Sequence, residues 1–305
     1  MSFVEKNLEK QQRAQQATAA SYSDAGIYGS VVTSTQRTLD ANGAPSNIQT
    51  RSVHINLQAL RAAGLLPPEH QERLIAKQYR QIKRPLIANA MGRGTAKLPG
   101  GHFIVMASAL PGEGKTFTCM NLAFSMSLEK DLRVVLVDGD VAKPHISKLF
   151  GIEAEPGLLD VLRDPQLDIE QCILRTNVQG LYVLPSGKPS ENATELLASA
   201  RMEDIARRLG ERDPQRIVLC DSPPLLLTTE SQALAQAAGQ IVVVVRAGET
   251  PHQAVLDALS HLVETKSIGL VLNQSRSEAS GGYYYGYGIY GDNNTGGRRK
   301  DSQPG

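Results

Sequence analysis

A glycine-rich loop carries the clearest chemistry in this sequence. The string Ala109-Leu-Pro-Gly-Glu-Gly-Lys-Thr116 follows an apolar run and precedes a stretch of helical character, which is the strand, loop and helix order of a phosphate-binding loop. Glycines let backbone N–H groups turn toward a triphosphate, Lys115 can reach its β- and γ-phosphates, and the Thr116 hydroxyl can bind Mg²⁺. The first position of the motif, usually glycine, is Ala109. We expect a nucleotide to bind through the following residues: Pro111, Gly112, Glu113, Gly114, Lys115, Thr116 and Phe117.

Three aspartates come directly after two other apolar runs. Asp138 and Asp140 follow the run 134–137, and Asp221 follows the run 217–220. In an open parallel sheet the carboxyl ends of the strands form one ligand crevice, so the three carboxylates should converge near the phosphate-binding loop. For each aspartate taken alone, a capping or turn role is the alternative.

Carboxylates gathered beside a triphosphate need a cation, and Mg²⁺ suits one or two carboxylates together with phosphate oxygens. We assign Thr116, Asp140 and Asp221 to the metal. A carboxylate beside the attacking oxygen can accept its proton during phosphoryl transfer, and we assign that role to Asp138. The predicted catalytic set is Lys115, Asp138 and Asp140.

Short apolar runs alternate with longer amphipathic stretches from about residue 101 onward. They predict strands at 103–106, 134–137, 181–184, 217–220, 241–245 and 268–272. Nearly continuous apolar strands that alternate with helices are typical of a parallel sheet covered on both faces. The sequence therefore predicts an α/β fold of the P-loop NTPase type, with a doubly wound, mostly parallel sheet and helices on both faces.

The flanking parts of the chain differ in composition. The first fifty residues are rich in Gln, Ala, Ser and Thr, which favours disorder. An amphipathic helix is predicted from Glu69 towards Arg84, where Pro85 should disturb it. We divide the chain into a largely disordered segment, a helical extension, a phosphate-loop domain and a flexible tail: 1–50, 51–98, 99–275 and 276–305.

Bulk composition excludes several classes of protein. The formal net charge is +1, so no overall field favours nucleic acid as a partner. Cys119, Cys172 and Cys220 lack metal-ligand spacing and lie in apolar surroundings, which predicts core positions. The sequence has no run of about 18 apolar residues and no signal-peptide pattern. We expect neither a transmembrane segment nor a signal peptide, and a cytoplasmic chain that reaches the inner membrane only through a partner.

Together these strings resemble the bacterial tyrosine autokinase (BY-kinase) family. Pro-Gly-Glu-Gly-Lys-Thr, Val-Asp-Gly-Asp-Val-Ala-Lys-Pro and Cys-Asp-Ser-Pro-Pro look like its Walker A, Walker A′ and Walker B motifs. The stretch Tyr79-Arg-Gln-Ile-Lys-Arg-Pro-Leu-Ile, the stretch Ala193-Thr-Glu-Leu-Leu-Ala-Ser199 and the terminal Tyr-Tyr-Tyr-Gly-Tyr-Gly are similar to the branch associated with exosortase and the PEP-CTERM system. The resemblance covers about residues 50–290.

The resemblance implies an ATP-dependent protein-tyrosine kinase that phosphorylates its own C-terminal tyrosines and regulates exopolysaccharide polymerisation and export. Asp138 would then act on the incoming tyrosine hydroxyl, Asp140 and Asp221 would hold Mg²⁺ through water, and Asn273 would contact adenine. A strand-end turn residue is the alternative for Asn273. Because related chains carry a membrane-spanning activator segment fused to the kinase, the resemblance also implies a separate membrane chain-length-determinant or activator protein as partner.

A tyrosine cluster near the end of the chain offers the substrate hydroxyls. About ten residues separate it from Asn273, a coil span of ~18 Å with a limit of ~35 Å, which reaches a neighbouring subunit more easily than the chain's own site. We therefore expect phosphorylation in trans within a homo-oligomer, and the added charge should loosen assembly through the tail. An aromatic tail that is never phosphorylated is the alternative. The predicted phosphoacceptors are Tyr283, Tyr284, Tyr285, Tyr287 and Tyr290.

The sequence departs from the family where its Glu-x-x-Arg-x-x-Arg self-association helix aligns with Lys77, Arg80 and Lys83. A base in place of the acid does not support ring assembly, and a solvated basic face is the alternative. Two other functions stay open. One is a partition or division-site ATPase switch, whose extra loop lysine aligns with Leu110, and the other is a nucleotide-binding scaffold of a polysaccharide export complex.

Overall fold

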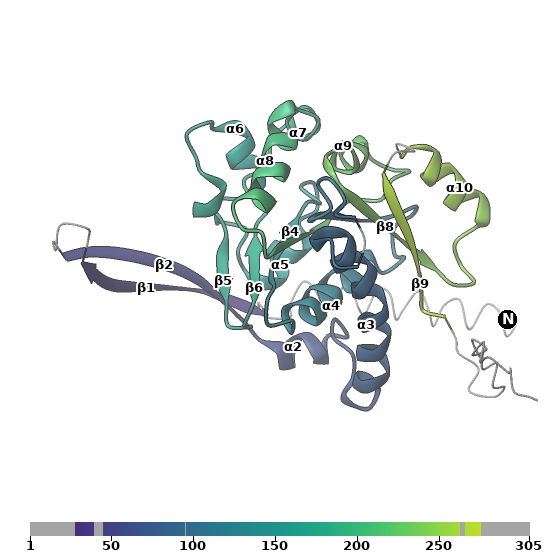
Figure 1. Cartoon of the computed structure of the whole chain (residues 1–305), viewed down its shortest axis with the longest axis horizontal. Helices are drawn as coiled ribbons and strands as arrows, with labels where there is room; N and C mark the ends of the chain where they lie inside the picture. Colours follow the sequence, from purple (N-terminus) through teal and green to yellow (C-terminus); the bar gives the residue numbers. More distant parts are fainter. Residues whose placement is uncertain (1–27, 40–44, 95, 263–265, 276–305) are drawn as a thin grey trace, which may run out of the picture. The chain divides into compact units, whose positions relative to one another are not determined.

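A sheet with six neighbouring parallel strands forms the centre of the protein (Figure 1). The computed structural model describes residues 28–39, 45–94, 96–262 and 266–275. The strand order is β1-β2-β5-β6-β4-β7-β3-β8-β9, and the strands from β6 to β9 in this order all run parallel. The strands are β1 Gly29–Leu39, β2 Pro45–Ile55, β3 Phe103–Ser108, β4 Arg133–Asp138, β5 Leu174–Thr176, β6 Leu181–Leu184, β7 Arg216–Asp221, β8 Gln240–Arg246 and β9 Ser267–Asn273.

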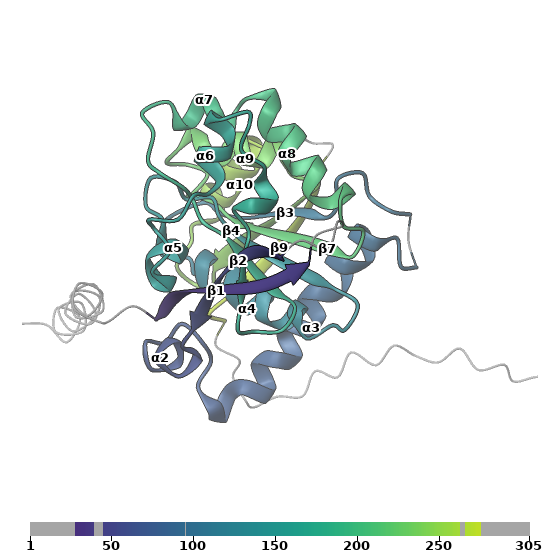
Figure 2. The same cartoon turned by 90° about the vertical axis from the view of Figure 1, so that its left-hand side faces the viewer.

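Helices cover both faces of the sheet, which confirms the predicted doubly wound fold (Figure 2). One face carries α6 to α10, and the other carries α2 to α5. A short 3-10 helix, η1, precedes β5. The helices are α2 Leu57–Ala62, α3 Glu69–Met91, α4 Lys115–Ser127, α5 His145–Phe150, α6 Leu158–Arg163, η1 Ile169–Gln171, α7 Ala193–Leu197, α8 Ala200–Glu211, α9 Thr229–Ala237 and α10 His252–Ser260.

Alternation along the central strands divides the interior into two hydrophobic cores. In β3, Phe103 and Val105 belong to the core beneath α6 to α10, whereas Ile104 and Met106 belong to the core beneath α3 and α4. Successive side chains of a strand point to opposite faces of its sheet. Every residue of β3 is buried, so the continuous apolar runs of the sequence are explained by burial on both faces.

The N-terminal strands correct two expectations. The composition predicts disorder up to residue 50 and a helical extension from residue 51. Instead, β1 and β2 pair antiparallel and join the sheet through Ser52 and Val53, which pair with β5. Val and Thr favour this extended conformation. Val53 and Ile55 are buried in the core of the α3 and α4 face. A pattern search for apolar runs missed these strands because few of their side chains are apolar.

Helix α3 continues past Pro85 to Met91, which contradicts the predicted interruption. Proline removes one helical hydrogen bond. Leu86, Ile87 and Ala90 lie beyond it and are buried in the core that also contains residues of α4. This burial keeps the last turns helical despite the proline. The helix ends at Gly92, whose positive φ of 69° caps it.

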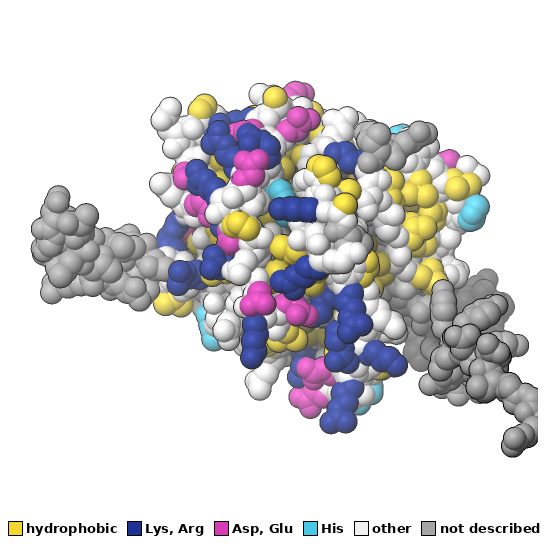
Figure 3. All heavy atoms as spheres, viewed as in Figure 1, with side chains coloured by type: hydrophobic (Ala, Val, Ile, Leu, Met, Phe, Trp, Pro, Cys, Tyr) yellow, Lys and Arg dark blue, Asp and Glu magenta, His cyan; other side chains and the backbone are white. Residues whose placement is uncertain are grey.

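The basic residues of α3 do not share one environment. Arg80 and Lys77 are exposed. Figure 3 shows Lys and Arg side chains gathered over the region of this helix. Lys83 is 5% exposed, and its ammonium group donates to the carbonyl oxygen of Ser125 at 2.6 Å and contacts Glu129 at 2.8 Å. Lys83 thus links α3 to the end of α4. A solvated basic face would leave this side chain exposed, so that alternative does not describe Lys83.

Cys119, Cys172 and Cys220 are buried and unpaired, as predicted for core positions. Burial raises the pKa of each thiol. Among the helices of the described residues, none combines the length and apolar character needed to cross a bilayer.

Candidate active site

The phosphate-binding loop lies between β3 and α4 and depends on a glycine with positive φ. Gly114 has φ 86° and caps α4, whose first residue is Lys115. A Cβ added at Gly114 would lie 2.1 Å from the side-chain amide nitrogen of Asn273, which would have to shift. The positive φ favours glycine here, because other residues adopt it only with strain. The conformation of Gly114 lets the loop lead directly into the first turn of α4.

The side chain of Glu113 fastens the same loop from within. It is 3% exposed, and its Oε2 accepts a hydrogen bond from the backbone N–H of Leu110 at 2.7 Å. Its Oε1 accepts from the hydroxyl of Thr250, in the segment between β8 and α10. Asn273 donates to the carbonyl oxygen of Glu113 at 2.9 Å. A contact within the loop and two contacts from distant parts of the chain thus hold Glu113 in place. No motif in the sequence pointed to Thr250.

Asp221, at the end of β7, links the two side chains that the motif assigns to phosphate and metal. Its Oδ1 accepts from the Lys115 ammonium at 3.2 Å, and its Oδ2 accepts from the Thr116 hydroxyl at 2.6 Å. Asp221 is fully buried and Lys115 is 8% exposed. Burial by itself would lower the pKa of Lys115, but Asp221 and Asp140 raise it above its ordinary value. Lys115 is therefore charged in the folded protein.

Asp138, at the end of β4, is paired in register with Asp221 on the neighbouring strand. It is fully buried, and its Oδ2 accepts from the backbone N–H of Ser147 at 2.7 Å. Its Oδ1 is buried without a hydrogen-bond partner among the described residues. Burial raises the pKa of Asp138 to about 7, and the negative charge of Asp221 adds to this increase. A carboxyl group with a pKa near neutrality and one oxygen unoccupied is suited to accept a proton.

Asp140 lies two residues further on, in a less enclosed position. It is 7% exposed, and its Oδ1 accepts from the backbone N–H of Lys143 at 3.1 Å. Burial raises its pKa, whereas Lys115 lowers it. Between the two acids, Gly139 donates to the carbonyl oxygen of Asp221 at 2.8 Å, and a Cβ there would lie 2.6 Å from that oxygen. Glycine is required at this position for the two acidic motifs to approach each other.

The donor set fits a magnesium nucleotide. Hydroxyl and carboxylate oxygens are the ligands that Mg²⁺ prefers, and Thr116, Asp140 and Asp221 supply them. Among the described residues, no three His, Cys, Asp or Glu side chains form a group that could hold a metal ion. Phosphate oxygens and water would therefore have to complete the shell, as is usual for Mg²⁺.

The predicted site residues have different positions in the structure. Lys115, Thr116 and Asp221 are in direct contact, and Pro111 and Gly112 are exposed at the outer turn of the loop. Phe117 is half-buried in the first turn of α4. Their roles in binding stay predictions, as does the contact of Asn273 with adenine. The five candidate phosphoacceptors, Tyr283, Tyr284, Tyr285, Tyr287 and Tyr290, lie outside the described residues.

The fold and this site define a phosphate-loop, nucleotide-binding α/β domain. A family model described as an AAA domain matches residues 101–273. The tyrosine-protein kinase YwqD of Bacillus subtilis is 31% identical over 216 residues, which cover 70% of this chain and 87% of that protein. The chain belongs to the family of bacterial tyrosine-protein kinases.

Other similar proteins agree with this assignment. The tyrosine-protein kinase Wzc of Salmonella typhimurium is 30% identical over 193 residues, 62% of this chain and 26% of that protein. The kinase domain of the Escherichia coli tyrosine kinase ETK aligns with a TM-score of 0.58 and 25% identity over 70% of this chain and 80% of that domain. This chain thus spans about a quarter of the length of several curated relatives.

Proposed function

We propose that this chain is an ATP-dependent protein-tyrosine kinase that transfers the γ-phosphoryl group of ATP to tyrosines of its own C-terminal cluster, in trans. The observation that carries the proposal is the group of side chains at the ends of β4 and β7. Asp138 has one oxygen unoccupied and a pKa near neutrality, and its register partner Asp221 contacts both Lys115 and Thr116.

Each group has a defined part in this proposal. The loop N–H groups and Lys115 bind and orient the phosphates, which brings the γ-phosphoryl group to the strand ends. Thr116, Asp140 and Asp221 would hold Mg²⁺, which would neutralise phosphate charge. Asp138 accepts the proton of the tyrosine hydroxyl as that oxygen attacks, because its Oδ1 is the unoccupied acceptor. Asn273 supports the loop and contacts the adenine.

The cellular setting belongs to the same proposal. Relatives include the tyrosine-protein kinases Wzc and CpsD. The assignment to an exosortase-associated branch of the family rests on the sequence motifs alone. We propose a cytoplasmic chain that acts in exopolysaccharide polymerisation or export. A separate membrane chain-length-determinant protein would bring it to the inner membrane and activate it.

The ATPase-switch alternative is less well supported. Partition-type ATPases carry an extra lysine at the position of Leu110 in the sequence comparison above. Leu110 instead packs against the hydrophobic core beneath α6 to α10, and its backbone N–H is bonded to Glu113. A nucleotide-binding scaffold would need no proton acceptor, so the buried unoccupied oxygen of Asp138 favours the kinase.

Mass spectrometry of the purified full chain after incubation with Mg-ATP tests the proposal. We expect phosphotyrosine within 283–290, none in Lys115→Met, and none in the variant with all five cluster tyrosines changed to Phe. Phosphorylation that persists unchanged in the five-fold variant would rule out the tail as substrate. Nucleotide hydrolysis without any phosphotyrosine, with or without a second copy carrying Lys115→Met as acceptor, would favour the ATPase switch.

A further inference from the structure

A polar cavity lies at the edge of the sheet where β4 and β7 begin. Its volume is about 280 Å³. Arg133 and Arg216 are the first residues of these strands, whereas Asp138 and Asp221 are their last. At about 3.3 Å per residue, five residues separate the cavity from the acids by ~17 Å. The lining residues are Arg133, Val135, Glu170, Ile173, Arg175, Tyr182, Asp213 and Arg216.

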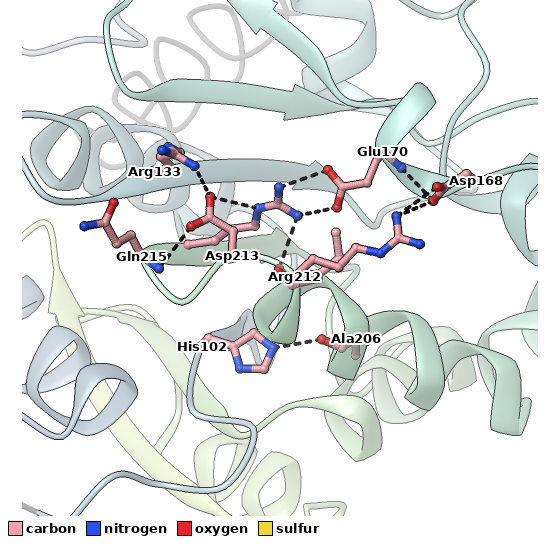
Figure 4. Close-up of polar contacts among 10 residues, drawn as sticks. His102, Arg133, Asp168, Glu170, Ala206, Arg212, Asp213 and Gln215 are labelled. Carbon is pink, nitrogen blue, oxygen red and sulfur yellow. Dashed lines mark hydrogen bonds and ion pairs between the residues drawn. The ribbon is translucent and has the colours of Figure 1, made fainter. Parts of the chain in front are cut away.

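Both carboxylates of the cavity are already occupied as acceptors (Figure 4). Glu170 accepts two hydrogen bonds from Arg216, at 2.6 and 2.9 Å. Asp213 accepts from Arg133 at 2.7 Å and from the backbone N–H of Gln215 at 3.1 Å. A ligand with N–H or O–H donors would therefore have to displace an existing ion pair.

The donors of the cavity, in contrast, are incompletely used. Arg133 uses one terminal nitrogen, and its Nε and second terminal nitrogen bond to nothing within the described residues. Arg175 is exposed and forms no hydrogen bond or ion pair within that part of the chain. Tyr182, its antiparallel register partner on β6, has a hydroxyl that likewise lacks a partner there. Three guanidinium groups against two carboxylates leave the cavity with a net positive charge.

We propose that this cavity is a binding site for a phosphoryl dianion, separate from the phosphate-binding loop. Planar guanidinium groups present paired N–H donors that match phosphate oxygens. Arg133 and Arg175 would donate to the phosphate from two strands, and the Tyr182 hydroxyl would donate a further hydrogen bond. The ion pairs to Glu170 and Asp213 keep the guanidinium groups of Arg216 and Arg133 in position.

The dianion has two possible sources that share this chemistry. One is free inorganic phosphate, which needs only the arginine donors. The other is the phosphoryl group of a phosphotyrosine side chain, whose ring would lie against Tyr182 and the partly buried Ile173. A ring contact adds affinity beyond that of the shared phosphate, so the two sources differ in measured binding.

Nuclear magnetic resonance of the ¹⁵N-labelled full chain tests the site through the arginine Nε–Hε signals. Inorganic phosphate and O-phospho-L-tyrosine are titrated separately at low salt, and backbone signals of the phosphate-binding loop report binding there in the same sample. We expect saturable shifts of the Arg133 and Arg175 signals, assigned by their loss in Arg133→Gln and Arg175→Gln. Equal affinities identify free phosphate as the ligand, and tighter binding of phosphotyrosine identifies the ester.

Variants separate the cavity from the loop. Because a charge-assisted hydrogen bond is strong, Arg175→Gln should weaken binding at the Arg133 signal about tenfold or more. Since the Arg175 side chain has no partner within the described residues, we expect its substitution to leave the fold intact. Arg207→Gln, in an exposed ion pair on α8, is the matched control and should change nothing. Absence of arginine shifts when the loop is saturated, or equal binding by Arg175→Gln, would overturn the proposal. The readout does not depend on kinase activity.

Discussion

Asp138→Asn tests the electrostatic state of the site by stability alone. Burial raises the pKa of Asp138 from 3.8 to about 7, and one pKa unit corresponds to about 1.36 kcal/mol. Ionising this carboxyl in the folded protein therefore costs up to about 4 kcal/mol. Asparagine keeps an oxygen that can accept from the Ser147 N–H but carries no charge, so the variant avoids this cost.

The sign of the pH dependence follows from the direction of the shift. Because the pKa of Asp138 is higher in the folded chain than in the unfolded chain, the folded state holds the proton more tightly. Stability of the unsubstituted protein should fall as the pH rises from about 4 to about 7 through this group. The advantage of Asp138→Asn should thus be largest at pH 8 or above and small near pH 4.

Thermal unfolding of both proteins at several pH values measures this advantage. For a chain of this size, about 1 kcal/mol moves the melting temperature by ~2–4 °C, so an increase of roughly 10 °C at high pH is expected. Asp131→Asn, at an exposed position without a hydrogen-bond partner among the described residues, should show no such pH-dependent difference. A melting temperature of Asp138→Asn at or below that of the unsubstituted chain at pH 8 would refute the reasoning.

Three further predictions test single residues of the site and of helix α3. Asp221→Asn should weaken Mg-nucleotide binding at least tenfold in calorimetry, because Mg²⁺ would lose a negatively charged carboxylate beside Thr116. Unchanged affinity would remove Asp221 from the metal site. Gly114→Ala should weaken nucleotide binding about tenfold or more, since alanine is strained at φ 86° and its Cβ would displace the Asn273 side chain. Binding at normal affinity would show that the loop does not need this conformation. Lys83→Met should cost about 1–3 kcal/mol in urea unfolding, because the hydrogen bond to the Ser125 carbonyl and the ion pair with Glu129 are lost. An equal loss in the exposed control Lys77→Met would contradict that cause.

The sequence predicted the central sheet because its strands are buried on both faces. Runs such as 134–137 are continuously apolar, which is expected where a strand is buried on both faces of its sheet. The strands β1 and β2 carry no such signal, because few of their residues are apolar. β1 is the edge strand of the sheet, and β2 pairs with β5 only through Ser52 and Val53. Helix α3 exceeded its predicted end because burial of Leu86 and Ile87 outweighs the local cost of Pro85, and burial is not readable from one helix alone.

In the site, too, some residues could be predicted from motif spacing, whereas others depend on tertiary contacts. Motif spacing was enough to expect Lys115, Thr116 and Asp221 near each other, because strand ends of a parallel sheet meet at one edge. It could not indicate that Thr250 closes on Glu113, or that Ser147 donates to Asp138. Thr250 lies in a loop and Ser147 in the first turn of α5. The positions of both are set by the folded sheet, and serine and threonine are too common in such segments to mark them.

The contacts of Asp221 connect nucleotide binding with metal binding. One buried carboxylate, that of Asp221, accepts from both Lys115 and Thr116. When phosphates take the Lys115 ammonium, Asp221 loses the charge that compensates it while remaining fully buried, and an uncompensated buried charge costs several kcal/mol. A divalent cation beside Thr116 restores that compensation. The triphosphate and the cation should therefore bind cooperatively, because each removes the electrostatic penalty that the other would meet alone.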